Sequence, residues 1–363
     1  LVTGLTATNA DGTVRDLGQF GLENFELTAT APLAAIMGPA LPNERAISAK
    51  LSGAILGNGG QTIGLLNGDL GSEVSDKQLA GPLTAKIDIT RIDVEALERI
   101  IGKNGMVSGA IGSPASAAIR ANVVPPAGAP RGAAFDFAAA TTNVEATLEA
   151  PKFRSDGPLS ASMTPVAVRL TKPSRFTLDA TPAWINSFLA PPPPPASALP
   201  VGAKPQPPAL TIREIAPISL TLESLTLPRA GPQNAGGAPL ETALSLQIPR
   251  LAAITADQTP LQMSNFAFNV KSEPPGPSGT PVAFTCAIAE TAVGDKPPVP
   301  GLSIRGVLDG LVASDGSFNP EYATLSTQGE LPNVNTALID AVSTRDGTLV
   351  DALGPTTQAK FNI

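Results

Sequence analysis

The chain has 363 residues, of which 38 are Pro and 34 are Gly, and it contains no His, one Cys and only 4% aromatic residues. Without His it lacks the usual general base near neutral pH, the commonest metal ligand and the partner of Ser or Cys in most triads. Catalysis by carboxylates or Lys stays open in principle, but we expect a non-catalytic protein without metal or cofactor. A net charge of −7, with scattered Lys and Arg, offers no basic surface for nucleic acid.

Strict alternation of apolar and polar residues is the dominant local pattern. From residue 83 to 90, Leu, Ala, Ile and Ile take one face, whereas Thr, Lys, Asp and Thr take the other. This pattern is typical of a half-buried strand, and it recurs in roughly fifteen segments along the chain. We therefore expect a mainly β fold, an elongated and curved antiparallel sheet that forms a β-groove or an open sandwich. Three or four short helices should lie at repeat junctions.

The apolar positions of these strands are the candidate functional residues, because they should share one side of the sheet. In chain order they are Leu51, Ile55, Ile87, Ile89, Ile119, Val123, Phe135, Phe137, Leu148, Val168, Leu170, Phe176, Leu178, Leu220, Leu222, Leu246, Ile248, Phe266, Phe268, Phe284 and Ile288. The single Cys286 falls on the parity of Phe284 and Ile288, and we interpret it as an apolar strand residue.

In two of these segments the parity of the apolar positions changes midway, from odd to even residue numbers or from even to odd. Residues 159–163 give way to residues 166–170 across Thr164-Pro165, and residues 218–222 give way to residues 225–227 across Glu223-Ser224. One inserted residue restores the apolar face after a kink, so a β-bulge is predicted at both places.

Short amphipathic helices are predicted directly after four of the strands. The first covers residues 30–37, the second begins after Asp93, and the fourth begins near residue 335. The third begins at Thr181-Pro182, where a capping hydroxyl precedes a Pro at the first helical position.

Residues 94–121 and 336–363 follow one pattern at a constant offset of 242. Each copy has a short helix, an Asn-Gly or Asp-Gly turn, an apolar step that ends in Gly, and an alternating strand. Internal repetition of this kind favours a stacked architecture. Because the chain opens and stops inside such patterns, we expect it to be a fragment of a longer protein.

The Pro-rich segment 191–208 is predicted to be an extended connector. Residues 1–190 should then hold β-groove repeats with short helices, and residues 209–363 should continue the same sheet.

Motifs that carry chemistry are weak. Asn9 and Asp11 resemble the start of a calcium loop whose remaining ligands are missing, so a turn is expected there. Residues 58–60 lack the Lys-Ser/Thr of a phosphate loop. Glu95 and Glu98 fall on the predicted wet face of their helix, and we interpret both as solvated.

The unit of strand, Leu/Ile helix, Asn/Asp-Gly step and strand, present in residues 83–123, 174–190 and 325–363, resembles bacterial AsmA-like proteins, relatives of TamB and the repeating β-groove proteins. The Thr-Pro-Ala-Trp-Ile-Asn helix at 181–186 and the run at 346–355 are similar to elements of that family. The resemblance implies a place in the bacterial cell envelope, periplasmic or intermembrane, with attachment to membranes through segments outside this sequence. It also implies a β-groove whose apolar inner face carries lipid acyl chains between membranes without catalysis.

The leading hypothesis is therefore a groove that binds or conducts lipid acyl chains. The alternative is a structural envelope or surface-assembly protein whose apolar face is closed against a second sheet or a partner chain. An enzyme ranks third, and would need an uncovered carboxylate cleft. The sheet edges are candidate places for self-association or for a partner chain.

Overall fold

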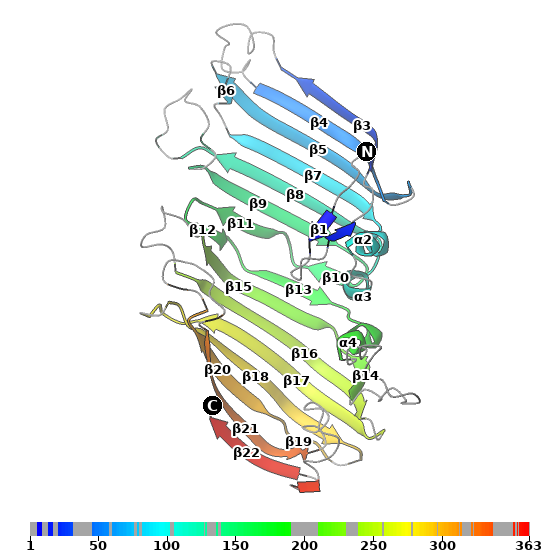
Figure 1. Ribbon diagram of the computed structural model, residues 1–363, viewed down its shortest axis with the longest axis vertical. Helices are drawn as coiled ribbons and strands as arrows, with labels where there is room; N and C mark the ends of the chain where they lie inside the picture. The colour runs from blue at the N-terminus through cyan, green and yellow to red at the C-terminus, as the bar shows by residue number, and fades with distance from the viewer. Residues whose placement is uncertain are drawn as a thin grey trace. The chain divides into compact units, whose positions relative to one another are not determined.

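The computed structural model describes residues 6–8, 14–16, 21–31, 46–57, 60–75, 78–79, 82–101, 105–126, 128, 136, 139–189, 210–229, 239–255, 258–276, 279–295, 297–311, 313, 321, 323–336, 351–352, 354 and 356–362. Within these residues the fold is mainly β and antiparallel, the sheet is not closed, and three short helices are present (Figure 1). The predicted fold class is therefore confirmed. The Pro-rich segment 191–208 lies outside the described residues, so the predicted domain boundaries remain a prediction.

The chain divides into two compact units. The first contains residues 1–176, 222–242 and 314–317, and the second contains residues 177–221, 243–313 and 318–363. Each unit is described separately below.

The first unit holds a run of antiparallel strands. Its strands are β1 Thr6–Thr8, β2 Val14–Asp16, β3 Gly21–Thr30, β4 Ala46–Leu56, β5 Thr62–Ser75, β6 Gln78–Leu79, β7 Leu83–Ile92, β8 Ala115–Val124, β9 Thr141–Glu149, β10 Phe153–Ser155, β11 Leu159–Met163 and β12 Ala167–Leu170. Pairing proceeds from β3 through β4, β5, β7, β8, β9 and β11 to β12. β12 then pairs with residues 226–228 of β15 Ile218–Pro228. β1 and β2 pair only with each other in the described part of the unit.

The second unit also holds a run of antiparallel strands. Its strands are β14 Leu210–Ile215, β16 Glu241–Thr255, β17 Pro260–Ser272, β18 Val282–Val293, β19 Val299–Pro300, β20 Ser303–Asp309, β21 Thr324–Asn335 and β22 Thr356–Asn362. β14 pairs with β16, and the ladder proceeds through β17, β18, β20 and β21 to β22. The short β13 Ser174–Leu178, together with β15 and β16, contributes residues to both units.

The internal repeat is visible in the strand register. Ile87 pairs with Ile119 and Ile89 pairs with Ala117 between β7 and β8. At the offset of 242, Gly329 pairs with Phe361 and Leu331 pairs with Ala359 between β21 and β22. The bulge recurs as well, because the register shifts between residues 89 and 92 in one copy and between residues 331 and 334 in the other. The strand part of the predicted repeat is thus repeated in the structure, whereas residues 337–350 of the second copy lie outside the described residues.

Helices lie at strand ends and bury the small cores there. Helix α2, Val94–Ile101, is capped by Asp93, whose Oδ1 accepts a hydrogen bond from the Ala96 amide at 2.9 Å. Helix α4, Pro182–Leu189, begins after Thr181, whose Oγ1 accepts one from the Trp184 amide at 3.4 Å. Both predicted starts are confirmed. Of the other two predicted helices, residues 32–37 and 337–350 lie outside the described part of the chain.

Two clusters of buried apolar side chains lie beside these helices. Ile63 and Ala96 form one cluster, which joins α2 to the end of β5. Ile212, Ala253 and Leu261 form a second cluster, against which residues of α4 and β14 pack. These two clusters therefore hold the helices against the strands.

One predicted bulge is wrong. β11 and β12 are separate strands that pair with each other, with Met163 opposite Val168, so the parity change at Thr164-Pro165 is a hairpin turn. Thr164 closes that turn: its amide donates to the Ala167 carbonyl at 2.8 Å, and its Oγ1 accepts from the Ala167 amide at 3.1 Å. Pro165 suits the turn because it has no amide to leave unpaired. The second parity change lies inside one continuous strand, β15, where the bulge stays a prediction.

Glu98 is also not the solvated residue that the sequence predicted. Helix α3, Met106–Ile111, follows α2 closely, and Glu98 of α2 is only 2% exposed. Its carboxylate accepts hydrogen bonds from the amides of Gly105, at 3.2 Å, and Val107, and from Ser108 Oγ. The first amides of a helix have no partner within it, so the carboxylate satisfies the start of α3. From the sequence, only a short apolar segment that ends in Gly was predicted there. Helix α3 was missed because its six residues are too few to show a helical periodicity.

Acid is expected to loosen this contact. Burial raises the pKa of Glu98, but the hydrogen bonds from Ser108 Oγ and from the amides of Val107, Ser108 and Gly105 outweigh it, so the pKa lies below its usual value. A lowered folded-state pKa stabilises the protein at pH values above the unfolded-state pKa of about 4.3, and this stability disappears as the pH falls through the folded-state value.

Glu98→Gln should therefore lower the free energy of opening of α3 at neutral pH by about 1–3 kcal/mol, because buried donors lose a charged acceptor. Hydrogen exchange of residues 107–111, corrected for intrinsic rates, measures this, and the difference from the parent protein should shrink in acid. Glu95→Gln, on the exposed side of the same helix, is the matched control and should change nothing. Equal protection in both variants at neutral pH would contradict the role given to Glu98.

Candidate functional site

Strand register brings the apolar residues of the first unit into rows that cross the strands. Residues directly opposite each other in an antiparallel ladder project from the same face. One row starts on β3, ends on β11, and consists of Leu27, Leu51, Gly68, Ile87, Ile119, Ala146 and Leu159. Three predicted residues, Leu51, Ile87 and Ile119, thus come together from segments that are far apart in the sequence.

Three parallel rows lie on the same face. They are Gly53, Leu66, Ile89, Ala117 and Leu148; Ala29, Ala49, Leu70, Ala85, Ala121, Val144, Ala161 and Leu170; and Leu83, Val123, Thr142, Met163, Val168 and Leu227. None of these residues carries a charge. Ile55, opposite Gly64, belongs to the same face. We call the residues of these four rows, with Ile55, the apolar face of the first unit.

Side chains of this face are unusually exposed for their chemistry. Leu27 is 58% exposed and Ile119 is 40% exposed, although Ile119 lies in the middle of its row. Leu159, Met163 and Leu227, at the other end of the face, are exposed as well. A continuous apolar surface in water marks a place where something else binds. At the centre of the face, Ile119 is exposed, whereas Leu51 and Ile87 are half-buried.

The second unit presents an equivalent set of rows. They are Leu246, Phe268, Cys286, Ile304 and Gly329; Leu244, Val270, Phe284 and Gly306; and Ile248, Phe266 and Ile288. These residues are the apolar face of the second unit, and again none is charged. Cys286 lies in the middle of the first row, as predicted, and burial raises the pKa of its thiol.

Glycines shape both faces by leaving room for a neighbouring large side chain. A Cβ at Gly68 would lie 2.9 Å from Leu51 Cγ, and a Cβ at Gly306 would lie 2.5 Å from Phe284 Cζ. The Phe284 ring also lies near that of Phe268, with centroids 6.3 Å apart. The large side chains of Leu51 and Phe284 therefore lie against the glycine backbone of the next strand, and the apolar face protrudes less at these points.

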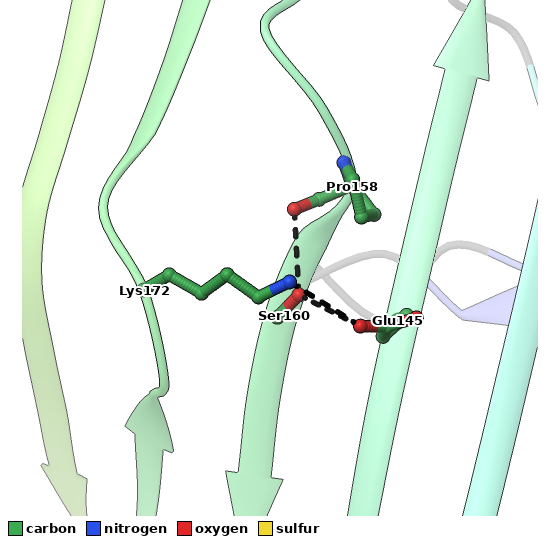
Figure 2. A network of polar contacts seen from close by, with 4 residues as sticks. All are labelled: Glu145, Pro158, Ser160 and Lys172. Carbon is green, nitrogen blue, oxygen red and sulfur yellow. Dashed lines mark hydrogen bonds and ion pairs between the residues drawn. The ribbon is translucent and has the colours of Figure 1, made fainter.

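The opposite face of the first unit is polar and charged. One of its rows contains Lys50, Asp69, Lys86, Arg120, Glu145 and Ser160. A hollow of about 480 Å³ lies over its centre, lined by both polar and apolar residues of β5, β7, β8 and β9. Figure 2 shows the end of the row, where Lys172 Nζ lies 3.5 Å from Glu145 Oε1 and Ser160 Oγ makes long hydrogen bonds to Glu145 and to the Pro158 carbonyl. Exposed pairs of this kind contribute little stability, so this face mainly keeps the sheet hydrated.

The predicted lining residues can now be placed. Fifteen lie on the two apolar faces defined above: Leu51, Ile55, Ile87, Ile89, Ile119, Val123, Leu148, Val168, Leu170, Leu246, Ile248, Phe266, Phe268, Phe284 and Ile288. Phe176, Leu178, Leu220 and Leu222 are half-buried on β13 and β15, the strands shared by the two units, and the described registers do not assign them to a face. Phe135 and Phe137 lie outside the described residues.

The sequence reasoning missed several members of the faces. Gly68 and Gly306 have no side chain to reveal a parity, and Ala49, Ala85 and Ala121 are too small to stand out. Their positions become evident only when register places them between larger residues. Within the described part of the chain, no group of three His, Cys, Asp or Glu residues could hold a metal ion. No helix there is both long and apolar enough to cross a membrane.

Together, the fold and these faces define a mainly β protein whose antiparallel sheet has one charge-free apolar face and one hydrated face. Searches against family models, curated proteins and solved structures find no match for this chain.

Proposed function

We propose that the apolar faces bind lipid acyl chains and conduct them along the sheet, and that the protein acts without catalysis in the bacterial envelope, periplasmic or intermembrane. The observation that carries the proposal is the row through Leu27, Ile119 and Leu159, which is apolar and uncharged and is exposed at both ends and at Ile119 between them. Each methylene group removed from water contributes about 0.8 kcal/mol, so a chain lying along such a row is held without any specific polar contact. The location within the envelope rests on the resemblance to AsmA-like proteins.

The lack of charge also supports movement along the face. Successive rows offer an acyl chain chemically similar contacts, so no single position needs to hold it more tightly than the next. An unpaired charge would break this continuity. The opposite, hydrated face keeps the sheet in water while the apolar face is occupied.

A structural envelope or surface-assembly protein is the second candidate. It is favoured by the position of the hollows, of about 480 and 520 Å³, which lie among polar residues such as Arg120 in the first unit and Arg305 in the second. An apolar face that packs against a partner sheet needs no hollow of its own. The cover would then come from another chain, since the described sheet is not closed on itself.

Cys286 provides a direct test, because it is the only cysteine and lies on the apolar face. A maleimide fluorophore that responds to polarity should attach to it in the native protein, slowly at neutral pH because the thiol pKa is raised. Adding phospholipid vesicles should shift its emission to the blue. The matched control is Thr285→Cys in a Cys286→Ser background, one residue along the strand and on the polar face, where no shift is expected.

A native protein whose Cys286 cannot be labelled, or whose label does not respond to lipid, would favour the structural candidate. The same shift at residue 285 would mean that lipid does not distinguish the two faces, and it would contradict the proposal.

A further inference from the structure

Helix α4 is fixed firmly to the strands of the second unit. Ile185 packs against the buried cluster of Ile212, Ala253 and Leu261. Asn186 binds the backbone of β14 in both directions: its Nδ2 donates to the Ile212 carbonyl at 2.9 Å, and its Oδ1 accepts from the Ile212 amide at 2.7 Å. Figure 1 shows the helix beside β14. Because the helix is held in this way, the position of its last turn is fixed as well.

The last turn of α4 is nevertheless apolar and exposed. Phe188 is 51% exposed and Leu189 is 44% exposed. Trp184, half-buried one turn earlier, meets the Phe188 ring edge to face, with centroids 5.1 Å apart. We call Trp184, Phe188 and Leu189 the α4 tip. A surface helix usually turns such residues toward the core, so a fixed helix that presents them to water marks a binding surface.

The sequence around the α4 tip is free of charge. No Asp, Glu, Lys or Arg occurs from residue 180 to residue 203, which is the longest uncharged run in the chain. By contrast, α2 carries Glu95, Glu98 and Arg99 in a helix of the same length. A charged side chain is costly inside a lipid bilayer, whereas Trp and Phe are favoured at its interface with water. The composition of the α4 tip therefore suits a lipid surface.

The size of the α4 tip favours the same partner. Its three side chains, two of them about half exposed, present far less than the roughly 800 Å² per partner that a specific protein interface buries. A lipid surface needs no complementary shape, and a few apolar side chains are enough to hold a protein on it.

We propose that the α4 tip inserts into a lipid surface and holds the second unit on a membrane. The inference goes beyond the binding of acyl chains by the apolar faces, and it does not depend on it. Attachment to a membrane would then use a segment within this sequence.

Trp184 provides the test, because it is the only Trp in the chain. Phosphatidylcholine vesicles should shift its emission to the blue, and vesicles with bromine on the acyl chains should quench it. Added salt should leave both effects unchanged, since no charge takes part. Phe188→Ser and Leu189→Ser should each weaken binding to the vesicles about tenfold, measured by co-sedimentation. Leu189→Ser also leaves the contact between the Trp184 and Phe188 rings in place.

Leu325→Ser is the matched control, because it removes a side chain that is 57% exposed on β21 of the same unit. It should leave vesicle binding unchanged. No blue shift in the parent protein would overturn the proposal, and so would binding that needs anionic lipid and disappears in salt. Full binding by the folded Phe188 and Leu189 variants would overturn it too. A lipid response at labelled Cys286 without one at Trp184 would remove only the α4 tip and leave lipid binding by the apolar faces in place.

Discussion

Ile119→Asp is expected to abolish lipid transfer while leaving the melting transition nearly unchanged. Ile119 is 40% exposed in the middle of its row, so a carboxylate there stays partly hydrated and costs the fold little. An acyl chain that passes the same point must instead cover the charge, and an unpaired buried charge costs several kcal/mol. Transfer between donor and acceptor vesicles should fall roughly a hundredfold or more.

Leu246→Asp should act in the same way on the apolar face of the second unit. Matched controls add the same charge to the same strands on the polar face: Asn122→Asp, three residues after Ile119, and Gln247→Asp, next to Leu246. Both controls should transfer lipid normally. Collapse of the melting transition in the Ile119 and Leu246 variants would indicate a closed, packed interior and favour the structural candidate. Normal transfer by both folded variants would remove conduction from consideration.

Gly301→Ala is expected to give the largest loss of stability. A Cβ at Gly301 would lie 2.2 Å from the Ile288 carbonyl oxygen and 2.9 Å from its carbonyl carbon, and backbone cannot move aside as a side chain can. The amide of Gly301 also donates to the Ala289 carbonyl at 3.0 Å, so a shift breaks the local ladder. We expect a loss of about 2–4 kcal/mol, seen as a lower melting temperature.

Gly276→Ala is the matched control in the same unit. The nearest atom to its added Cβ is the Gly279 carbonyl oxygen at 3.8 Å, an ordinary contact. Its melting temperature should stay close to that of the parent protein. Equal melting of the two variants would show that the close approach at Gly301 is not a constraint on the fold.

Sequence periodicity predicted the features that depend on local chemistry. Alternation identified Ile87 and Ile119 as members of the apolar face of the first unit and Phe268 as a member of the apolar face of the second, because side chains of a strand alternate regardless of its neighbours. The caps at Asp93 and Thr181 were predicted for a similar reason, since a cap needs only the residues beside it.

Features that depend on distant or ambiguous partners were missed. The parity change at Thr164-Pro165 suits either a bulge or a turn, and only the pairing of Met163 with Val168 decides in favour of the turn. Glu98 has the sequence context of a solvated residue, and it becomes buried because α3 folds back onto it. Similarly, Gly68 contributes to the apolar face only through the neighbouring Leu51.

Native mass spectrometry of gently purified protein, followed by lipid extraction, tests the central claim most directly. An apolar face that holds acyl chains should retain phospholipid through purification, and the complexes should be heavier than the bare chain by the mass of one or more lipids. The Ile119→Asp variant should retain less than the parent protein, and the Asn122→Asp variant should retain as much. Recovery of no phospholipid from the folded parent protein, at any mild condition, would contradict lipid binding by this face.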